Sequence, residues 1–261
     1  MKITRRLLCA AMCVWAALQA SAAGAGTATG RPALAVLVYH RFDPAKPGPT
    51  TVTNRVFEQQ LDWLTAHHIQ VLPLEAVVAA SRGEGTALTA PAVAITVDDG
   101  HESVYTQLYP IIQRRHLPVT LFIYPSAISN ASYALTWTQL MAMKTSGLVD
   151  IQSHTFWHPN FRTERKRLAP QDYRAFVDRQ LKQSKAILEH RLGGTVTMLA
   201  WPFGIVDPEL EAAASRAGYV AAFAYEGGRL RAGDDPLALS RIPISDRDRG
   251  AAFAALFGGA P

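Results

Sequence analysis

The sequence predicts an α/β fold, a (β/α) barrel, complete or incomplete, of about seven strands. Short apolar runs such as "AVAITV" alternate with longer segments of helical periodicity. The runs are apolar almost throughout, which is typical of parallel strands covered on their outer face by helices. No internal repeat or low-complexity linker divides the chain of 261 residues, so one large domain is favoured over two small ones.

The N-terminal segment precedes the expected domain and has the pattern of a secretory signal peptide. Lys2, Arg5 and Arg6 are followed by an apolar run of about a dozen residues and by "ASA" at 20–22. An uncleaved anchor is the alternative, but the run is short for a membrane span of about 20 residues. We therefore expect a signal peptide at 1–22, a flexible lead-in at 23–32 and the folded domain at 33–261.

Removal of this segment would change the composition of the mature protein. Both cysteines, Cys9 and Cys13, lie in it, so a metal site of the mature chain would use His, Asp or Glu. Three of 26 basic residues would be lost, leaving 23 basic and 21 acidic residues and a net charge of +2. No basic stripe interleaved with aromatic residues remains, so we expect no nucleic-acid partner. A periplasmic or secreted protein with no stable membrane span is expected.

The expected strands follow the apolar runs in chain order, and the last one is the weakest candidate. They are residues 33–39, 92–97, 119–124, 148–153, 196–201, 219–225 and 237–244.

Helical patterns lie between these runs, and several carry end signals. The expected helices are residues 54–68, 103–116, 137–147, 170–194 and 207–218. Asn54 is the expected N-cap of the first helix, and Asp207-Pro208 is typical of an N-cap followed by proline in the first turn. Gly147, Gly193 and Gly218 stand where helix C-caps belong.

Polar residues follow four of the expected strands at their carboxyl ends, where (β/α) barrels hold their active sites. His40 ends the first strand, and Asp98 and Asp99 end the second. Ser153 and His154 follow a third strand, with His158 four positions later. The segment 201–204, "WPFG", ends a fourth. Their common placement predicts one site at this end of the sheet.

The residue types in this set suit a metal hydrolase. Two adjacent carboxylates are costly to bury without compensation, although one Asp could simply cap the next helix. His154 and His158, at i and i+4, would share one face of a helical turn and could converge on a metal with an Asp. The second carboxylate would then be free to act as a general base. A HExxH peptidase is excluded because Thr155 stands where that motif has Glu.

The segments "TVDDG" (96–100) and "SHTFWHP" (153–159) resemble two motifs of the polysaccharide deacetylases, carbohydrate esterase family 4. The resemblance covers essentially the whole mature chain. It implies a deformed (β/α) barrel that removes acetyl groups from N-acetylated sugars. By position it implies Asp98 as general base and Asp99, His154 and His158 as ligands of a divalent metal, zinc first, with nickel and cobalt as alternatives. It also implies an oxyanion-binding backbone N–H at Phe203.

The sequence departs from the family pattern at three places. Ala200 in "AWPF" replaces the arginine that orients the base, and Arg241 in "SRIPI" is a candidate substitute. The fourth motif has no clear counterpart. The C-terminal histidine that supplies the general acid is missing, since no histidine follows His190. His40 is then the candidate acid, on a strand moved to the start of the chain by circular permutation; a purely structural histidine is the alternative.

The opening of the chain resembles the branch that includes poly-N-acetylglucosamine deacetylases, so a polysaccharide substrate is expected. Trp157, Trp201, Pro202 and Phe203 are candidate substrate-binding residues, with core packing an equal explanation for Trp201. His101 could also line the site. Another acylated glycan, such as peptidoglycan or an O-acetylated polymer, and a non-catalytic carbohydrate-binding relic remain open. An exopolysaccharide-export partner is also left open.

Overall fold

The computed structural model describes residues 33–225 and 227–258. The expected signal peptide and lead-in lie outside these residues. No helix in the described ranges is both long and apolar enough to span a bilayer.

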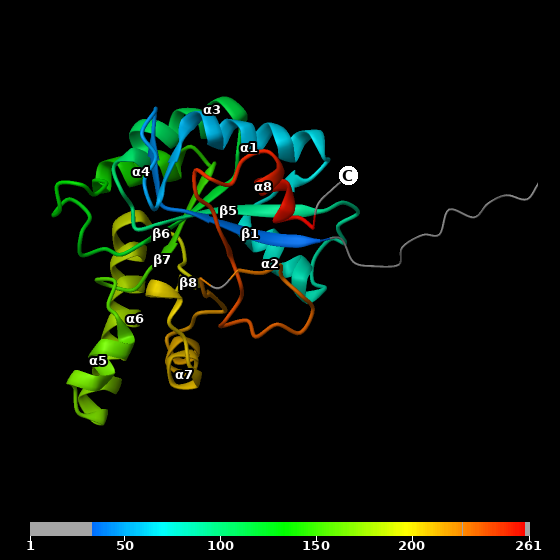
Figure 1. Cartoon of the computed structure of the whole chain (residues 1–261). Helices are drawn as coiled ribbons and strands as arrows, with labels where there is room; N and C mark the ends of the chain where they lie inside the picture. Colours follow the sequence, from blue (N-terminus) through cyan, green and yellow to red (C-terminus); the bar gives the residue numbers. More distant parts are fainter. Residues whose placement is uncertain (1–32, 226, 259–261) are drawn as a thin grey trace, which may run out of the picture. The chain divides into compact units, whose positions relative to one another are not determined.

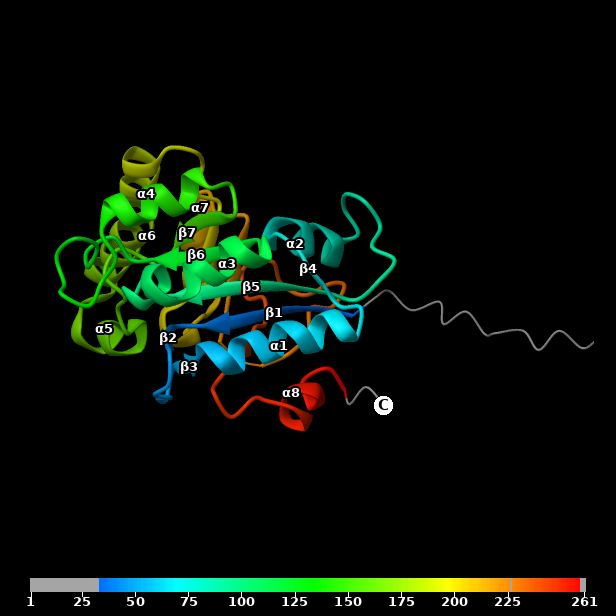
Figure 2. The ribbon, with the colours of Figure 1, turned by 90° about the horizontal axis from the view of Figure 1, so that it is seen from above.

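The main sheet is parallel and curls on itself (Figures 1 and 2), with the strand order β10-β1-β5-β6-β7-β8-β9. β4 (Gln70–Val71) pairs with the start of β5, and β2 (Arg41–Asp43) pairs with β3 (Thr51–Thr53) in a separate small sheet. The strands of the main path are β1 (Leu34–Tyr39), β5 (Ala92–Asp98), β6 (Val119–Ile123), β7 (Val149–Ser153), β8 (Met198–Ala200), β9 (Ala221–Phe223) and β10 (Ile242–Pro243). The predicted α/β fold with a curled, incomplete barrel is confirmed.

The seventh strand position is irregular, and it joins the two edges of the curled sheet. Leu239 bridges to Phe223 of β9, and Ile242 pairs with Leu37 of β1. Only two residues of the expected strand 237–244 are regular, because the segment changes its pairing partner from β9 at Leu239 to β1 at Ile242. The short segment between the two pairings, which contains Arg241, therefore spans the gap between β9 and β1.

Helices lie outside the curled sheet (Figures 1 and 2). The predicted segment 103–116 divides into a π-helical turn, Val104–Leu108, and an α-helix. Three short helices, α2, α5 and α8, were not predicted. The α-helices are α1 (Asn54–Ala66), α2 (Leu74–Arg82), α3 (Tyr109–Arg115), α4 (Trp137–Thr145), α5 (Phe161–Arg167), α6 (Pro170–Leu192), α7 (Pro208–Arg216) and α8 (Ala251–Ala255).

The helix caps agree with the sequence at α7 but differ at α1. Asp207 caps α7 by accepting two backbone N–H groups at 3.0 Å, and Pro208 occupies the first turn. The prediction of Asn54 as an N-cap is wrong, because Asn54 is already helical and the Thr53 hydroxyl accepts the N–H of Val56. The capping hydroxyl simply lies one residue earlier.

Successive side chains along a strand point alternately into two different apolar clusters. Alternate residues of β5, Val93, Ile95 and Val97, belong to the larger cluster between sheet and helices. Ala92 and Ala94 belong to the smaller cluster inside the curl of the sheet, with Phe122 and Phe223. The same alternation directs Thr96 and Asp98 to the interior, so the fold itself aims the first carboxylate into the barrel.

Candidate active site

The predicted site residues gather at the carboxyl end of the sheet, as the parallel strand order requires. β1 and β5 pair in register up to Tyr39 and Val97, so His40 and Asp98 are the next neighbours along the two strands. β7 ends at Ser153, and His154 follows it directly. Three strands that are far apart in the sequence therefore deliver their polar residues to one place.

Asp98 is held by a fully buried arginine from the far end of the chain. Arg241 donates from Nη1 to Oδ1 at 2.8 Å and from Nη2 to Oδ2 at 2.7 Å, a parallel two-bond pairing. The side chains are 0% and 2% exposed. The candidate substitute for the missing motif arginine thus contacts the carboxylate that it was expected to orient.

Two further donors of Arg241 are satisfied inside the barrel. Its Nε donates to the carbonyl of Ala224 at 3.1 Å, and Nη1 also reaches the Thr96 hydroxyl at 3.3 Å. The guanidinium carbon lies 5.5 Å from the centre of the Phe122 ring. A buried charge needs a counter-charge and hydrogen bonds, and these four hydrogen bonds fix the position of the ion pair.

The charges around Asp98 keep it ionised in spite of its burial. Burial alone would raise the pKa of this carboxyl, but the charge of Arg241 and the hydrogen bonds from its guanidinium lower it to about 2. Asp98 is therefore a carboxylate at any physiological pH.

Asp99, His154 and His158 form a cluster of potential metal ligands next to this pair. Asp99 Oδ1 lies 3.6 Å from His154 Nε2 and 3.7 Å from His158 Nε2. One ligand atom from each residue lies within 4.8 Å of the others. Two imidazoles and one carboxylate on one side leave other coordination positions open, as catalytic metal sites require.

His154 is prepared as a neutral ligand. Its Nδ1 lies 2.7 Å from the carbonyl oxygen of Ala200, so this nitrogen carries the proton and Nε2 faces the cluster. Burial lowers the pKa of His154 to about 3, which keeps the ring uncharged. Ala200, which stands where the family has arginine, thus contributes its backbone to the site.

The two histidines converge through a loop and not through a helix, so the predicted helical turn is wrong. Residues 154–160 are irregular, and Thr155 and His158 have φ angles of 66° and 61°. The Thr155 hydroxyl accepts the N–H of His158 at 3.2 Å, and the Ser153 hydroxyl accepts that of Thr155 at 3.2 Å. These short-range hydrogen bonds offset the cost of left-handed backbone at residues other than glycine.

The "DDG" segment makes an equally tight turn. Asp99 and Gly100 have φ angles of 74° and 76°. A Cβ on Gly100 would lie 2.9 Å from Ile123 Cδ1, so only glycine fits here without a shift of its neighbours. The turn separates the two carboxylates: Asp98 stays with the barrel interior, and Asp99 faces the histidines.

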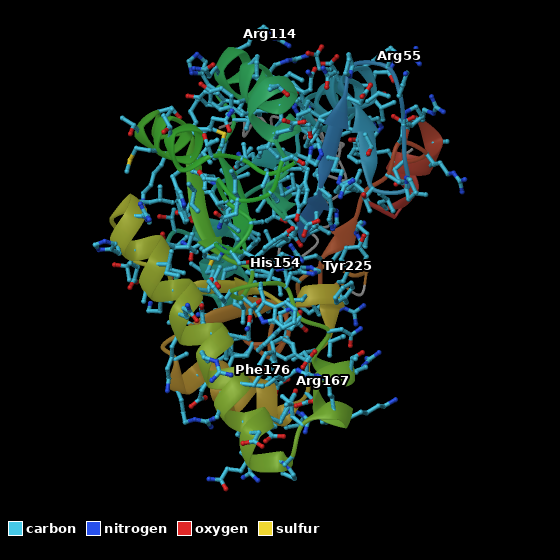
Figure 3. All side chains as sticks on the ribbon, turned by 90° about the vertical axis from the view of Figure 1, so that its left-hand side faces the viewer. Arg55, Arg114, His154, Arg167, Phe176 and Tyr225 are labelled. Carbon is cyan, nitrogen blue, oxygen red and sulfur yellow. The ribbon has the colours of Figure 1, made fainter. Side chains whose placement is uncertain are left out.

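His40 lies at the rim of this site beside a residue that the sequence analysis missed. The His40 ring packs against Tyr225 at 5.8 Å between centres. Tyr225 passes so close to Gly204 that a Cβ there would lie 2.6 Å from the Tyr225 backbone nitrogen. Figure 3 labels His154 and Tyr225, which project next to one another in that view.

The four candidate substrate-binding residues divide into two pairs. Phe203 is 60% exposed with its ring 4.6 Å from that of His158, and Trp157 is 44% exposed. Trp201 is 1% exposed, and its indole N–H donates to the Leu237 carbonyl at 2.8 Å. Pro202 is also buried. Neither side chain has a free face, which agrees with the core-packing explanation for Trp201, and substrate binding by Trp201 and Pro202 stays a prediction.

Two tyrosines near the metal-ligand cluster carry a sequence signal, because each stands at or just beyond the end of a strand. Tyr124 follows β6 directly, and its ring lies 5.5 Å from that of His158. Tyr225 lies two residues beyond the end of β9. Both stand at carboxyl ends of predicted strands, so applying the strand-end rule to every strand would have named them.

Comparisons with known proteins agree with this geometry. A family model described as polysaccharide deacetylase matches residues 86–222. The Bacillus subtilis protein YxkH, named as a polysaccharide deacetylase, is 28% identical over 229 residues, 87% of this chain and 77% of that one. The poly-beta-1,6-N-acetyl-D-glucosamine N-deacetylase of Staphylococcus epidermidis is 24% identical over 200 residues, 75% and 68% of the two chains.

Solved structures show the same fold. IcaB from Ammonifex degensii has a TM-score of 0.77 at 24% identity, covering 88% of this chain and 98% of that one. The Streptococcus pyogenes deacetylase PplD, in complex with acetate, has a TM-score of 0.76 at 22% identity, covering 89% and 100%. The family model spans more than half of the chain and includes both the "TVDDG" and "SHTFWHP" segments. The chain belongs to the polysaccharide deacetylase family and is a hydrolase.

Proposed function

We propose that this protein is a metal-dependent hydrolase that removes N-acetyl groups from an N-acetylglucosamine-type polysaccharide. The observation that carries the proposal is the buried Asp98–Arg241 pair standing beside the cluster of Asp99, His154 and His158. A non-catalytic relic of the fold has no physical reason to keep an ionised carboxylate next to a set of metal ligands. The glycan class is supported by the relatives named for poly-beta-1,6-N-acetyl-D-glucosamine.

The ligand cluster fits a divalent metal. The neutral Nε2 of His154 is aimed at the cluster, and Asp99 adds a negative charge. Two nitrogens and one oxygen suit zinc, and nickel and cobalt accept the same donors. When bound, such a cation polarises an acetamide carbonyl and lowers the pKa of water held at the site.

Asp98 is the proposed general base. Its Oδ2 lies 3.8 Å from His154 Nε2, so the carboxylate borders the space in which water would be held. It accepts a proton as the water attacks the acetamide carbon. Arg241 positions the carboxylate through its two hydrogen bonds and keeps it ionised before each turnover. The backbone N–H of Phe203 is the proposed donor to the oxyanion.

His40 is the proposed general acid. The departing nitrogen must gain a proton as the C–N bond breaks, and a half-exposed histidine at the rim of the site can supply it. Its packing against Tyr225 limits where the ring can point. Acetate and the free amine of the sugar are then the products. Asp98 loses the proton it accepted to solvent, and His40 regains one from solvent.

The proposal includes a periplasmic or secreted location after cleavage of the signal peptide at 1–22, with residues 33–261 as the enzymatic domain. Relatives named as poly-N-acetylglucosamine deacetylases act on a polymer, which supports a site of action outside the cytoplasm. An exopolysaccharide-export partner would present the polymer to the site.

The test is amine release from β-1,6- and β-1,4-linked N-acetylglucosamine oligomers, peptidoglycan fragments and an O-acetylated glycan. The mature protein is stripped of metal and reloaded with zinc, nickel or cobalt. Metal-restored activity on the N-acetylglucosamine oligomers, lost in Asp98→Asn, would support the proposal. A preference for peptidoglycan fragments or the O-acetylated glycan would assign the enzyme to that substrate class instead. Metal binding without turnover on any of these glycans would favour a carbohydrate-binding relic.

A further inference from the structure

A groove of about 410 Å³ opens directly beside the metal-ligand cluster. His158 forms one end of its lining, so the groove and the cluster share a residue. The other walls come from the loop between β6 and α4 (Figure 1) and from the loop after β7. Its volume lies within the range of about 300–1,000 Å³ typical of small-molecule sites. The groove is lined by Tyr124, Ser126, Ala127, Asn130, Ala131, Tyr133, Trp157 and His158.

Exposed aromatic rings gather at this end of the molecule. Within the described ranges, only three Phe, Tyr or Trp side chains are exposed: Tyr133 at 41%, Trp157 at 44% and Phe203 at 60%. Tyr133 and Trp157 both line the groove, and Phe203, which is not part of its lining, packs against His158. Exposed apolar surface concentrated beside a catalytic centre marks a binding surface.

Both aromatic walls are fixed by the scaffold before any ligand binds. The Tyr133 hydroxyl lies 2.8 Å from that of Tyr124, and the Tyr133 carbonyl accepts the N–H of Glu102 at 2.8 Å. The backbone N–H of Trp157 donates to Gln180 Oε1 at 3.1 Å, and the indole ring packs edge-on against Phe176. Rings held in this way lose little conformational freedom when a ligand binds, which favours affinity.

The chemistry of the groove selects an uncharged ligand. Among the described residues that line it, none is Asp, Glu, Lys or Arg. Asn130, whose amide nitrogen donates to the Ser126 carbonyl at 2.9 Å, and the tyrosine hydroxyls provide neutral hydrogen-bonding groups. Aromatic faces with a few neutral polar groups match a pyranose ring, which has apolar C–H faces and a polar edge.

We propose that this groove is the subsite for the sugar residue next to the one being deacetylated, with that residue seated between Tyr133 and Trp157. This inference rests on the proposed function and adds to it a direction: the polymer runs from the metal-ligand cluster over the β6–α4 loop. It also predicts that the enzyme prefers oligomers to single sugars and neutral glycans to charged ones.

The test compares Tyr133→Ala and Trp157→Ala with a matched control, Met141→Ala, which removes a side chain of equal exposure (41%) on α4 outside the groove. Zinc-loaded proteins are assayed on an N-acetylglucosamine pentamer and on a small acetate ester. For each groove variant we expect the ratio of kcat/KM for the pentamer to kcat/KM for the ester to fall about tenfold, mainly through KM. Met141→Ala should keep the ratio of the wild type.

A ratio unchanged in both groove variants would overturn the proposal, and so would equal losses on both substrates, which a purely structural role predicts. Tyr133→Leu, which keeps the bulk of the side chain, replaces Tyr133→Ala if the latter does not fold. If the wild type deacetylates no N-acetylglucosamine oligomer, the proposed function fails separately. The groove is then tested by calorimetric titration of neutral oligosaccharides into Asp98→Asn and its Trp157→Ala derivative, and equal binding or none would overturn it.

Discussion

Replacing Arg241 by methionine (Arg241→Met) tests how the buried charge of Asp98 is held. Methionine fills a similar volume but removes the two hydrogen bonds of 2.7 and 2.8 Å and the positive charge. Asp98 is then left buried without its main counter-charge. Burial raises the pKa of this carboxyl and Arg241 lowers it, so the substitution shifts the pKa upward.

The size of the effect follows from the burial of the pair. Because the two side chains are 0% and 2% exposed, solvent screens the interaction little, and removing one partner of such a pair costs about 3–5 kcal/mol of stability. For activity, a misplaced or protonated base loses the factor of about 10²–10⁴ that general base catalysis supplies. Arg241→Lys keeps the charge but cannot form the parallel two-bond pairing, so we expect intermediate losses.

Urea unfolding measures the free energy of unfolding, and amine release from N-acetylglucosamine oligomers measures kcat. Arg165→Met is the matched control, because Arg165 also pairs with carboxylates, Asp207 and Glu209, but is 41% exposed. A pair at that exposure is worth about 0–1 kcal/mol. The reasoning is refuted if Arg241→Met unfolds like Arg165→Met and keeps the kcat of the wild type.

Three further predictions concern the turn, the core and the general acid. Gly100→Ala forces a Cβ to within 2.9 Å of Ile123 at a φ of 76°. We therefore expect the free energy of unfolding in urea to fall by about 1–3 kcal/mol and zinc binding to weaken. Unchanged stability and zinc affinity would contradict this expectation. Trp201→Ala, in the core, should lower the free energy of unfolding by about 3–5 kcal/mol. Phe203→Ala, at the surface, should change it by no more than about 0.5 kcal/mol. Similar losses in the two variants would count against the buried position of Trp201 and the exposed position of Phe203. His40→Ala should slow N-acetyl hydrolysis about 10²–10⁴-fold. Hydrolysis of an activated acetate ester should keep its rate, because the leaving group of that ester needs no proton. Equal losses of rate on both substrates would argue for a structural histidine.

The fold was predictable because its strands are buried on both faces. All six residues of β1 and all seven of β5 are buried, which is the condition that makes a strand appear as a continuous apolar run. The last strand was only weakly indicated, because its sheet pairing is limited to Leu239 and to two residues at Ile242–Pro243. Long-range contacts, and not local preference, place such a segment.

The site was predictable where strand ends or motifs determine it and not where packing decides. His40, Asp98 and His154 were found because parallel strands end at a common edge. The loop geometry of His154 and His158 could not be deduced from an i, i+4 spacing, which suits a helix equally well. The burial of Trp201 depends on contacts with Phe161 and Leu237, which lie 40 and 36 positions away in the sequence.

We propose that the two adjacent aspartates have different tasks, Asp99 as metal ligand and Asp98 as general base. Native mass spectrometry of the zinc-loaded protein, with amine release measured on the same samples, tests it most directly. We predict that Asp98→Asn retains one zinc ion but is inactive, whereas Asp99→Ala loses both the ion and the activity. An Asp98→Asn protein that loses zinc, or an Asp99→Ala protein that keeps both zinc and turnover, would contradict the claim.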